Sequence, residues 1–217
     1  MSRGLHLDTY LLAFDTGAGA LQDRTRAGYL VRAAALAELA HRGAVEEDGA
    51  GRVRVVSGAA TADPVLDELL AELGGAARSW KVWIRRGRDV TLEAVEERLA
   101  VLGVVTVADR DPYGPVVPHR PVTMVDPREA LDLQVRVAEL VRGATPVTRA
   151  PFADAVLAAL AAHGHLRLVL SRDDRRAHAD RISALTHRLA DQAPGLAKAV
   201  GGLNLTMIAA QGGLGGG

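Results

Sequence analysis

Three segments of the sequence share one pattern, in which an amphipathic helix is followed by a glycine stop and then by a short apolar strand. They are ALAELAHRGAV ending at Val45, AVEERLAVLGVV ending at Val105 and AVLAALAAHGHL ending at Leu166. Apolar residues three and four positions apart predict helix, and a glycine just past the last of them is typical of a helix C-terminus. Three such units with few long strands predict a mainly α protein with small β-hairpins.

Turn and capping signals place further elements. Residues 44–56 predict a hairpin, because an Asp-Gly turn joins two short strands. Asp63 followed by proline predicts the start of a helix. The run from Asp126 to Glu129 combines an N-cap, a first-turn proline and a capping-box glutamate, and so predicts a helix over 128–142. Further helices are predicted over 152–163, 175–190 and 195–210.

Length and composition bound the class of protein. With 217 residues, 48% of them hydrophobic and 24% charged, the chain is expected to bury a core as one domain over 1–211, with a disordered glycine-rich tail over 212–217. A two-domain alternative would divide it within the proline-rich arm after Asp109. No apolar run approaches the roughly 18 residues of a membrane span. We therefore expect a cytoplasmic protein that touches a membrane only at its cytosolic face.

Motifs of catalysis are weak. Asp15-Thr16-Gly17 copies the D-T-G signature of aspartic proteases, but its neighbours predict helix and a turn is the simpler interpretation. The chain has no cysteine, no H-E-x-x-H and no serine in a G-x-S-x-G elbow. His163 and His165 lack the spacing of a metal motif. The sequence predicts a protein that is not an enzyme and has no metal or cofactor.

The segment 77–88, ARSWKVWIRRGR, is the strongest local signal. It holds both tryptophans, Trp80 and Trp83, and five of the 26 basic residues of a chain whose formal net charge is zero. Indole and cations together are typical of a surface that lies on anionic lipid. The alternative is that both tryptophans are core anchors of an ordinary helix whose basic face is solvated. Composition favours neither. The five cations are Arg78, Lys81, Arg85, Arg86 and Arg88.

Two other classes of function stay open. Residues 30–56 have the outline of a winged helix, with Arg52 and Arg54 on the wing, which would make a nucleic-acid-binding module. Glu38 and the acidic run 46–48 make a poor surface for phosphates, so no nucleic acid is expected as a partner. The third class is a protein scaffold that binds other proteins without lipid.

Five stretches together resemble the Golgi phosphoprotein 3 family, and the resemblance covers nearly the whole chain. Their order and spacing carry the likeness more than any one motif does, and the Ala, Arg and Gly bias suits a bacterial-type member. The stretches are YLLAFDTGAG at 10–19, ELAHRG at 38–43, TADPVLDELL at 61–70, ERLAVLGVV at 97–105 and LNLTMIAA at 203–210.

The resemblance implies a fold and a function. It implies a central helical bundle wrapped by amphipathic helices, binding of phosphatidylinositol 4-phosphate at a membrane face, and an adaptor role in which the tails of membrane enzymes are bound. In the family, a hairpin near the proline-rich arm mediates self-association. We therefore expect a homo-oligomer formed through residues 109–124.

The family's lipid pocket uses one tryptophan and three arginines. One arginine position falls on Arg32, whereas the other three positions fall on Asp23, Asp89 and Leu92. Arg85 and Arg88 have the spacing of the family's arginine pair about one helical turn earlier. The predicted headgroup pocket is therefore Arg32 at a helix edge with its guanidinium free, together with Arg85, Arg88 and an inserted Trp80 or Trp83.

Overall fold

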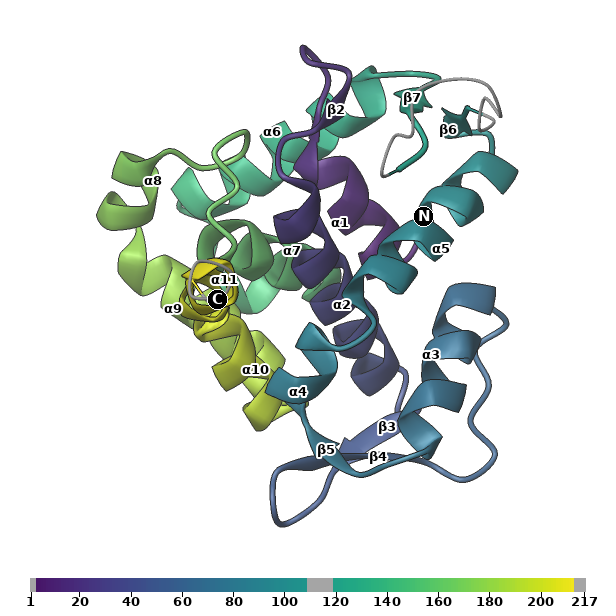
Figure 1. Cartoon of the computed structure of the whole chain (residues 1–217). Coiled ribbons are helices and arrows are strands. Elements are labelled where there is room, and N and C mark those ends of the chain that lie inside the picture. Colours follow the sequence, from purple (N-terminus) through teal and green to yellow (C-terminus); the bar gives the residue numbers. More distant parts are fainter. Residues whose placement is uncertain (1–2, 109–118, 213–217) are drawn as a thin grey trace.

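Helix α2 (Arg24–His41) is the central element of the structure, a computed structural model that describes residues 3–108 and 119–212 (Figure 1). Asp23 caps it by accepting a hydrogen bond from the Arg26 amide at 2.9 Å. Every residue over 27–37 is buried, because α1, α4, α5, α7 and α10 pack around the helix. This stretch is apolar except for Arg32, so the only cation in it must find its partner inside the protein.

The core is built by four helices. Helix α1 (Leu5–Ala13) is buried along its whole length and packs on α2, on α6 (Arg128–Arg142) and on α7 (Phe152–His163), and α7 also contacts both α2 and α6. Because α1 is buried on all sides, it has no amphipathic period, and the sequence did not predict it as a helix. The predicted class, mainly α with small hairpins, is confirmed.

The remaining helices wrap this core. Where the sequence predicts one helix over 175–190 there are two, and the same holds over 195–210, because the chain turns at His178 and at Gly202. In the described part of the chain, no helix is both long enough and apolar enough to cross a membrane. These helices are α3 (Pro64–Gly74), α4 (Trp80–Arg85), α5 (Arg88–Val101), the short 3-10 helix η1 (Val147–Arg149), α8 (Arg172–Ala177), α9 (Ala179–Ala190), α10 (Pro194–Gly201) and α11 (Leu203–Gly212).

Capping explains where two of the helices begin. Asp63 accepts hydrogen bonds from the amides of Val65 and Leu66, which confirms the predicted start of α3. Asp126 accepts from the Arg128 amide at 2.9 Å, and α6 has the predicted bounds. The predicted capping box is wrong, because Glu129 forms an ion pair with Arg3 at 2.8 Å instead.

The strands form three small antiparallel sheets. The predicted hairpin over 44–56 is confirmed, and a third strand brings the segment 77–88 beside it. Of the arm expected to mediate self-association, residues 122–124 pair with 105–107, and residues 109–118 lie outside the described part. The sheets are β1 (Phe14–Asp15) with β2 (Ala20–Leu21), β3 (Val45–Glu47) with β4 (Arg52–Val55) and β5 (Arg78–Ser79), and β6 (Val105–Val107) with β7 (Val122–Met124).

In each of the three repeated units the helix is followed by a residue in the left-handed conformation, which is glycine in two units and histidine in the third. Gly43 and Gly103 follow α2 and α5 in the left-handed region, at φ of 67° and 70°. After α7 that position belongs to His165, at φ of 54°, and no strand follows, contrary to the prediction. The glycine lies one position earlier, because a Cβ on Gly164 would come within 2.4 Å of the side chain of Leu30.

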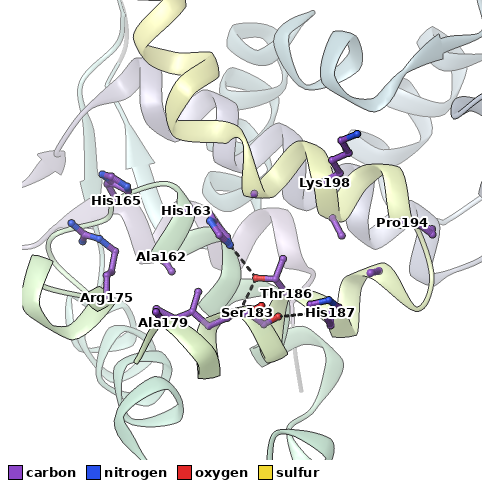
Figure 2. A pocket seen from close by; sticks show the side chains of 14 residues that line it. Ala162, His163, His165, Arg175, Ala179, Ser183, Thr186, His187, Pro194 and Lys198 are labelled. Carbon is purple, nitrogen blue, oxygen red and sulfur yellow. Dashed lines mark hydrogen bonds between the residues drawn. The ribbon is translucent and has the colours of Figure 1, made fainter. Parts of the chain in front are cut away.

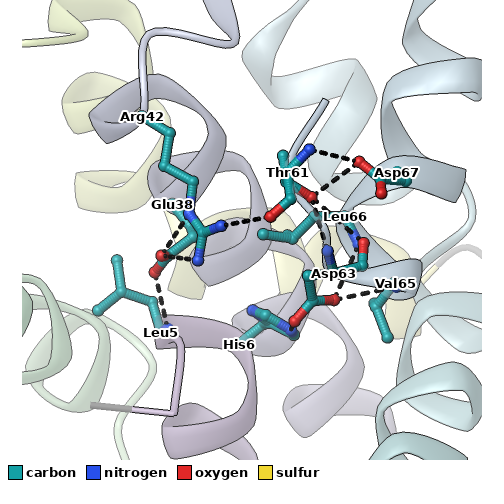
Figure 3. Close-up of polar contacts among 9 residues, drawn as sticks. All are labelled: Leu5, His6, Glu38, Arg42, Thr61, Asp63, Val65, Leu66 and Asp67. Carbon is teal, nitrogen blue, oxygen red and sulfur yellow. Dashed lines mark hydrogen bonds and ion pairs between the residues drawn. The ribbon is translucent and has the colours of Figure 1, made fainter. Parts of the chain in front are cut away.

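A polar network fastens α1, α2 and α3 to one another (Figure 3). Glu38 accepts the Leu5 amide at 2.9 Å and pairs with Arg42 at 2.7 Å. The imidazole of His6 lies 3.5 Å from the carboxylate of Asp63. Burial would raise the pKa of Asp63, but the hydrogen bond and charge of His6 hold it below its usual value. Two of the family-like stretches thus carry structural contacts.

Candidate functional site

The two tryptophans of segment 77–88 face the core. Trp80 and Trp83 are each 2% exposed, and the Trp80 indole N–H donates to Glu47 at 2.8 Å. The expectation that an indole inserts beside lipid tails is therefore wrong for this conformation, and the core-anchor alternative describes both residues. With its inner face held in this way, the six-residue helix α4 presents only its cations and Val82 outward.

Arg32 is inside the protein, and its guanidinium is fully engaged. It donates to the carbonyl of Trp83 at 3.1 Å, to the Thr91 hydroxyl at 2.7 Å and to the carboxylate of Glu72 at 2.6 Å. Burial lowers the pKa of Arg32, against the hydrogen bond and charge of Glu72. The expectation of a free guanidinium at a helix edge is wrong, because α2 is enclosed on all sides along this stretch. Arg32 instead ties α2 to α3, α4 and α5.

Gly87 forms the junction between α4 and α5. It adopts φ of 66°, and a Cβ there would lie 3.2 Å from the Arg32 guanidinium and 3.1 Å from the Glu72 carboxylate. A glycine is therefore required by both the backbone and the space. Gly87 lies between Arg85 and Arg88 in the sequence and against the Arg32 guanidinium in space. The structure therefore brings Arg32 close to the predicted arginine pair, but on the buried side of the chain.

Arg88 is half-buried and partly engaged. Its guanidinium lies 4.8 Å from the ring centroid of Tyr29, donates to the Arg85 carbonyl at 3.2 Å and pairs with Asp89 at 3.3 Å. A cation over an aromatic face gains electrostatic stabilisation. Arg88 thus fixes the start of α5 while 29% of its side chain stays exposed.

The other cations of the segment point to solvent. Arg78, Lys81 and Arg85 are exposed, and none of them has an ion pair or a side-chain hydrogen bond among the described residues. Arg86 is 61% exposed and lies 3.6 Å from Glu72. We call these four residues the α4 basic surface. Val82, which is 40% exposed, lies among them.

The departures from the family's lipid pocket have structural roles. Asp23 caps α2, Asp89 pairs with Arg88, and Leu92 is 1% exposed in the core. The contacts of Glu72 and Thr91 with Arg32 were missed by sequence reasoning, since no local pattern links residues 40 and 59 positions apart. The glycine inside a basic run was the one available sign of a close approach.

The winged-helix alternative fails on burial. Its recognition helix would be α2, and a helix buried on every side over 27–37 cannot lie in a major groove. Within residues 3–108 and 119–212, no three His, Asp or Glu side chains lie close enough together to share a metal ion.

The fold and the site define a class of protein: a mainly helical domain that has a buried central helix and a patch of exposed cations on its surface. A family model described as Golgi phosphoprotein 3 (GPP34) matches residues 5–202. The chain therefore belongs to the Golgi phosphoprotein 3 (GPP34) family, as the resemblance indicated. The family is not a known enzyme family. A search of curated proteins finds no match to this chain.

Proposed function

We propose that this protein binds a membrane peripherally, through the phosphate-bearing headgroups of anionic phospholipids, and that the α4 basic surface is the part that touches them. Phosphatidylinositol 4-phosphate is the lipid that family membership favours. The observation that carries the proposal is the arrangement of α4, in which three unpaired cations and Val82 face outward while two buried indoles hold the helix rigidly.

The predicted site residues divide into two groups in this proposal. Arg85 contacts a headgroup directly, and Arg88 flanks it with the exposed part of its side chain. Arg32, Trp80 and Trp83 are positioning residues, because their side chains are buried in the interior and cannot reach a headgroup. In this proposal the guanidinium groups that bind phosphate oxygens are those of Arg85 and Arg88, which a bilayer can reach.

The expected binding is local and modest. A basic side chain near an anionic leaflet contributes about 1 kcal/mol, so the four cations of the α4 basic surface supply about 4 kcal/mol. Since 26 basic residues balance 26 acidic ones, no global field adds to this. Insertion of Val82 adds an apolar contribution that is independent of salt.

Vesicle flotation tests the proposal. Vesicles of phosphatidylcholine are compared with vesicles that also contain phosphatidylinositol 4-phosphate or, at matched charge, phosphatidylserine. The parent protein should float with the anionic vesicles at low salt and most strongly with the phosphoinositide. The variant with Arg78→Glu, Lys81→Glu and Arg85→Glu together should stay at the bottom of the gradient.

A control reverses one cation elsewhere, and its match is Arg85→Glu alone, which makes the same charge change within the α4 basic surface and should float less than the parent. Arg128 is exposed at the start of α6, which lies away from α4 (Figure 1), so Arg128→Glu should float like the parent. Failure of the parent to float with any anionic vesicle, with protein partners still captured, would favour the scaffold alternative. If the triple variant floats unchanged with an unaltered melting temperature, the α4 basic surface is not the membrane site.

A further inference from the structure

A cavity of about 530 Å³ lies between the C-terminal end of α7 and helices α9 and α10 (Figure 2). This volume is within the range of about 300–1,000 Å³ that small-molecule sites occupy. Its floor is apolar, and Ala162, Ile182 and Ala197 contribute buried side chains to it. None of the lining residues in the described part of the chain is acidic. They are Ala162, His163, His165, Arg175, Ala179, Ile182, Ser183, Thr186, His187, Ala190, Pro194, Ala197, Lys198 and Gly201.

One end of the cavity concentrates positive charge. Figure 2 shows His165 and Arg175 side by side at that end, while Lys198 lies toward the other. Burial and then the charges of Arg175, Arg26, His163 and Arg167 lower the pKa of His165. The pKa of Arg175 is likewise lowered by burial and by other arginines. The neighbouring arginines therefore oppose protonation of His165, and a bound anion would favour it.

Acidic side chains near this end are already engaged. Asp174, the neighbour of Arg175, accepts two hydrogen bonds from Arg142 at 2.8 Å and closes the capping box of α8 with Ser171. Arg175 donates to the carbonyl of Leu170 at 2.6 Å and forms no ion pair among the described residues. Its charge is therefore not neutralised by the protein.

The histidine at this end occupies a position where glycine is the ordinary choice. His165 is the first residue past the cap of α7, and the same position after α2 and α5 is glycine. A left-handed conformation costs a non-glycine residue free energy. The imidazole has no hydrogen bond among the described residues that would repay this cost. A side chain retained at a strained position, at the mouth of a cavity and without a partner, points to a ligand.

The middle of the cavity is neutral. The Thr186 hydroxyl donates to the Ile182 carbonyl at 2.8 Å, so it accepts from Nε2–H of His163 at 3.1 Å. Burial lowers the pKa of His163, which keeps this ring uncharged beside the apolar floor. The Arg175 end and the neutral, apolar middle match the two parts of an amphiphile, and Lys198 at the other end is exposed to solvent.

We propose that this cavity binds a single-chain alkyl phosphate, with the phosphate at His165 and Arg175 and the alkyl chain on Ala162, Ile182 and Ala197. A phosphate suits the site better than a carboxylate, because it can accept from both Arg175 and His165, and a guanidinium can bind two of its oxygens at once. The cavity is lined by α7, α8, α9 and α10, so this activity is separate from headgroup binding at the α4 basic surface.

Calorimetric titration with three soluble probes tests the proposal without a bilayer. Octyl phosphate carries both parts of the ligand, octyl glucoside carries the same chain with a neutral head, and inorganic phosphate carries the head alone. Below the concentration at which either detergent forms micelles, octyl phosphate should bind at least about tenfold more tightly than the two other probes. Equal binding of octyl glucoside, equal binding of inorganic phosphate, or no binding of octyl phosphate would each overturn the proposal.

Variants locate the site. Arg175→Gln and His165→Gly should each weaken octyl phosphate binding about tenfold, the loss expected for one charge-assisted contact. Ser183→Phe fills the cavity from an exposed position and should abolish binding while the protein stays folded. The matched control is Arg176→Gln, an exposed arginine of the same helix outside the lining, which should bind like the parent. If folded His165→Gly and Ser183→Phe both bind normally, the cavity is not the site.

Discussion

The α4 basic surface and the cavity between α7, α9 and α10 use similar side chains in opposite arrangements. In α4 the large apolar rings of Trp80 and Trp83 point inward and the cations stand on an outward-facing surface. In the cavity the apolar groups form the floor of a hollow and the cations stand at one end of it. The first arrangement can meet only the charged outer layer of a partner, whereas the second can enclose a head and a tail together.

The two regions also show what decides the role of an arginine. Arg32 is 2% exposed and has Glu72 as its counter-ion, so its interactions are complete within the protein. Arg175 is half-buried without an acidic partner, so its charge is left for a ligand. The family position marked Arg32 as the ligand-binding residue of the two, but the presence of a counter-ion indicates the opposite.

The largest predicted effect follows from the counter-ion of Arg32. Glu72→Gln should lower the free energy of unfolding by about 3 kcal/mol, because it leaves a buried guanidinium uncompensated; the value is at the low end for broken buried pairs because the Glu72 side chain is 34% exposed. Chemical denaturation measures the loss. Arg86→Gln, which removes the exposed partner of the same carboxylate, should cost less than about 0.5 kcal/mol. Equal losses in the two variants would contradict the structural role of Arg32.

Salt should separate the two binding regions. Raising NaCl from about 0.05 M to about 0.5 M shortens the screening length severalfold, so vesicle binding through exposed cations should fall more than about tenfold. Octyl phosphate binding should fall less than about threefold, because its chain is held by apolar contacts and its head lies in a partly buried site. Flotation and calorimetry in the same buffers make the comparison. A similar fall in both would mean that the cavity recognises charge alone.

Local signals in the sequence were sufficient for much of the fold. The Asp63 cap and the bounds of α6 could be predicted because each depends on residues a few positions apart. Helix α1 could not, since a helix that is buried all round lacks the period that marks an amphipathic one. The local helix-glycine pattern likewise gave the ends of α2 and α5 correctly.

The candidate site was harder to predict, because its contacts are distant in sequence. The partner of Arg32 lies 40 residues away, and the partner of the Trp80 indole lies 33 residues away. Whether a tryptophan faces lipid or core depends on such contacts, so composition left both interpretations open. The cavity was missed for a related reason. His163 and His165 were weighed only as metal ligands, while Ile182 and Ala197 of the apolar floor come from helices that follow later in the chain.

The smallest predicted effect tests whether the structure at His165 favours function over stability. Replacement of this left-handed residue by glycine removes steric strain, and His165→Gly should raise the free energy of unfolding by about 0.5 to 1 kcal/mol. The matched variant is the reverse change, Gly103→His, at the equivalent position after α5, where a Cβ has open space. It should lower the free energy of unfolding by a similar amount.

Binding gives the second half of this test. The stabilised His165→Gly protein should have lost most of its affinity for octyl phosphate, while the destabilised Gly103→His protein should keep it. Opposite shifts in stability and affinity at one residue are the signature of a side chain retained for a ligand, since natural proteins accept strain mainly at functional positions. If His165→Gly instead unfolds more easily than the parent, the imidazole stabilises the fold. The end of α7 would then not be equivalent to the glycine-terminated ends of α2 and α5.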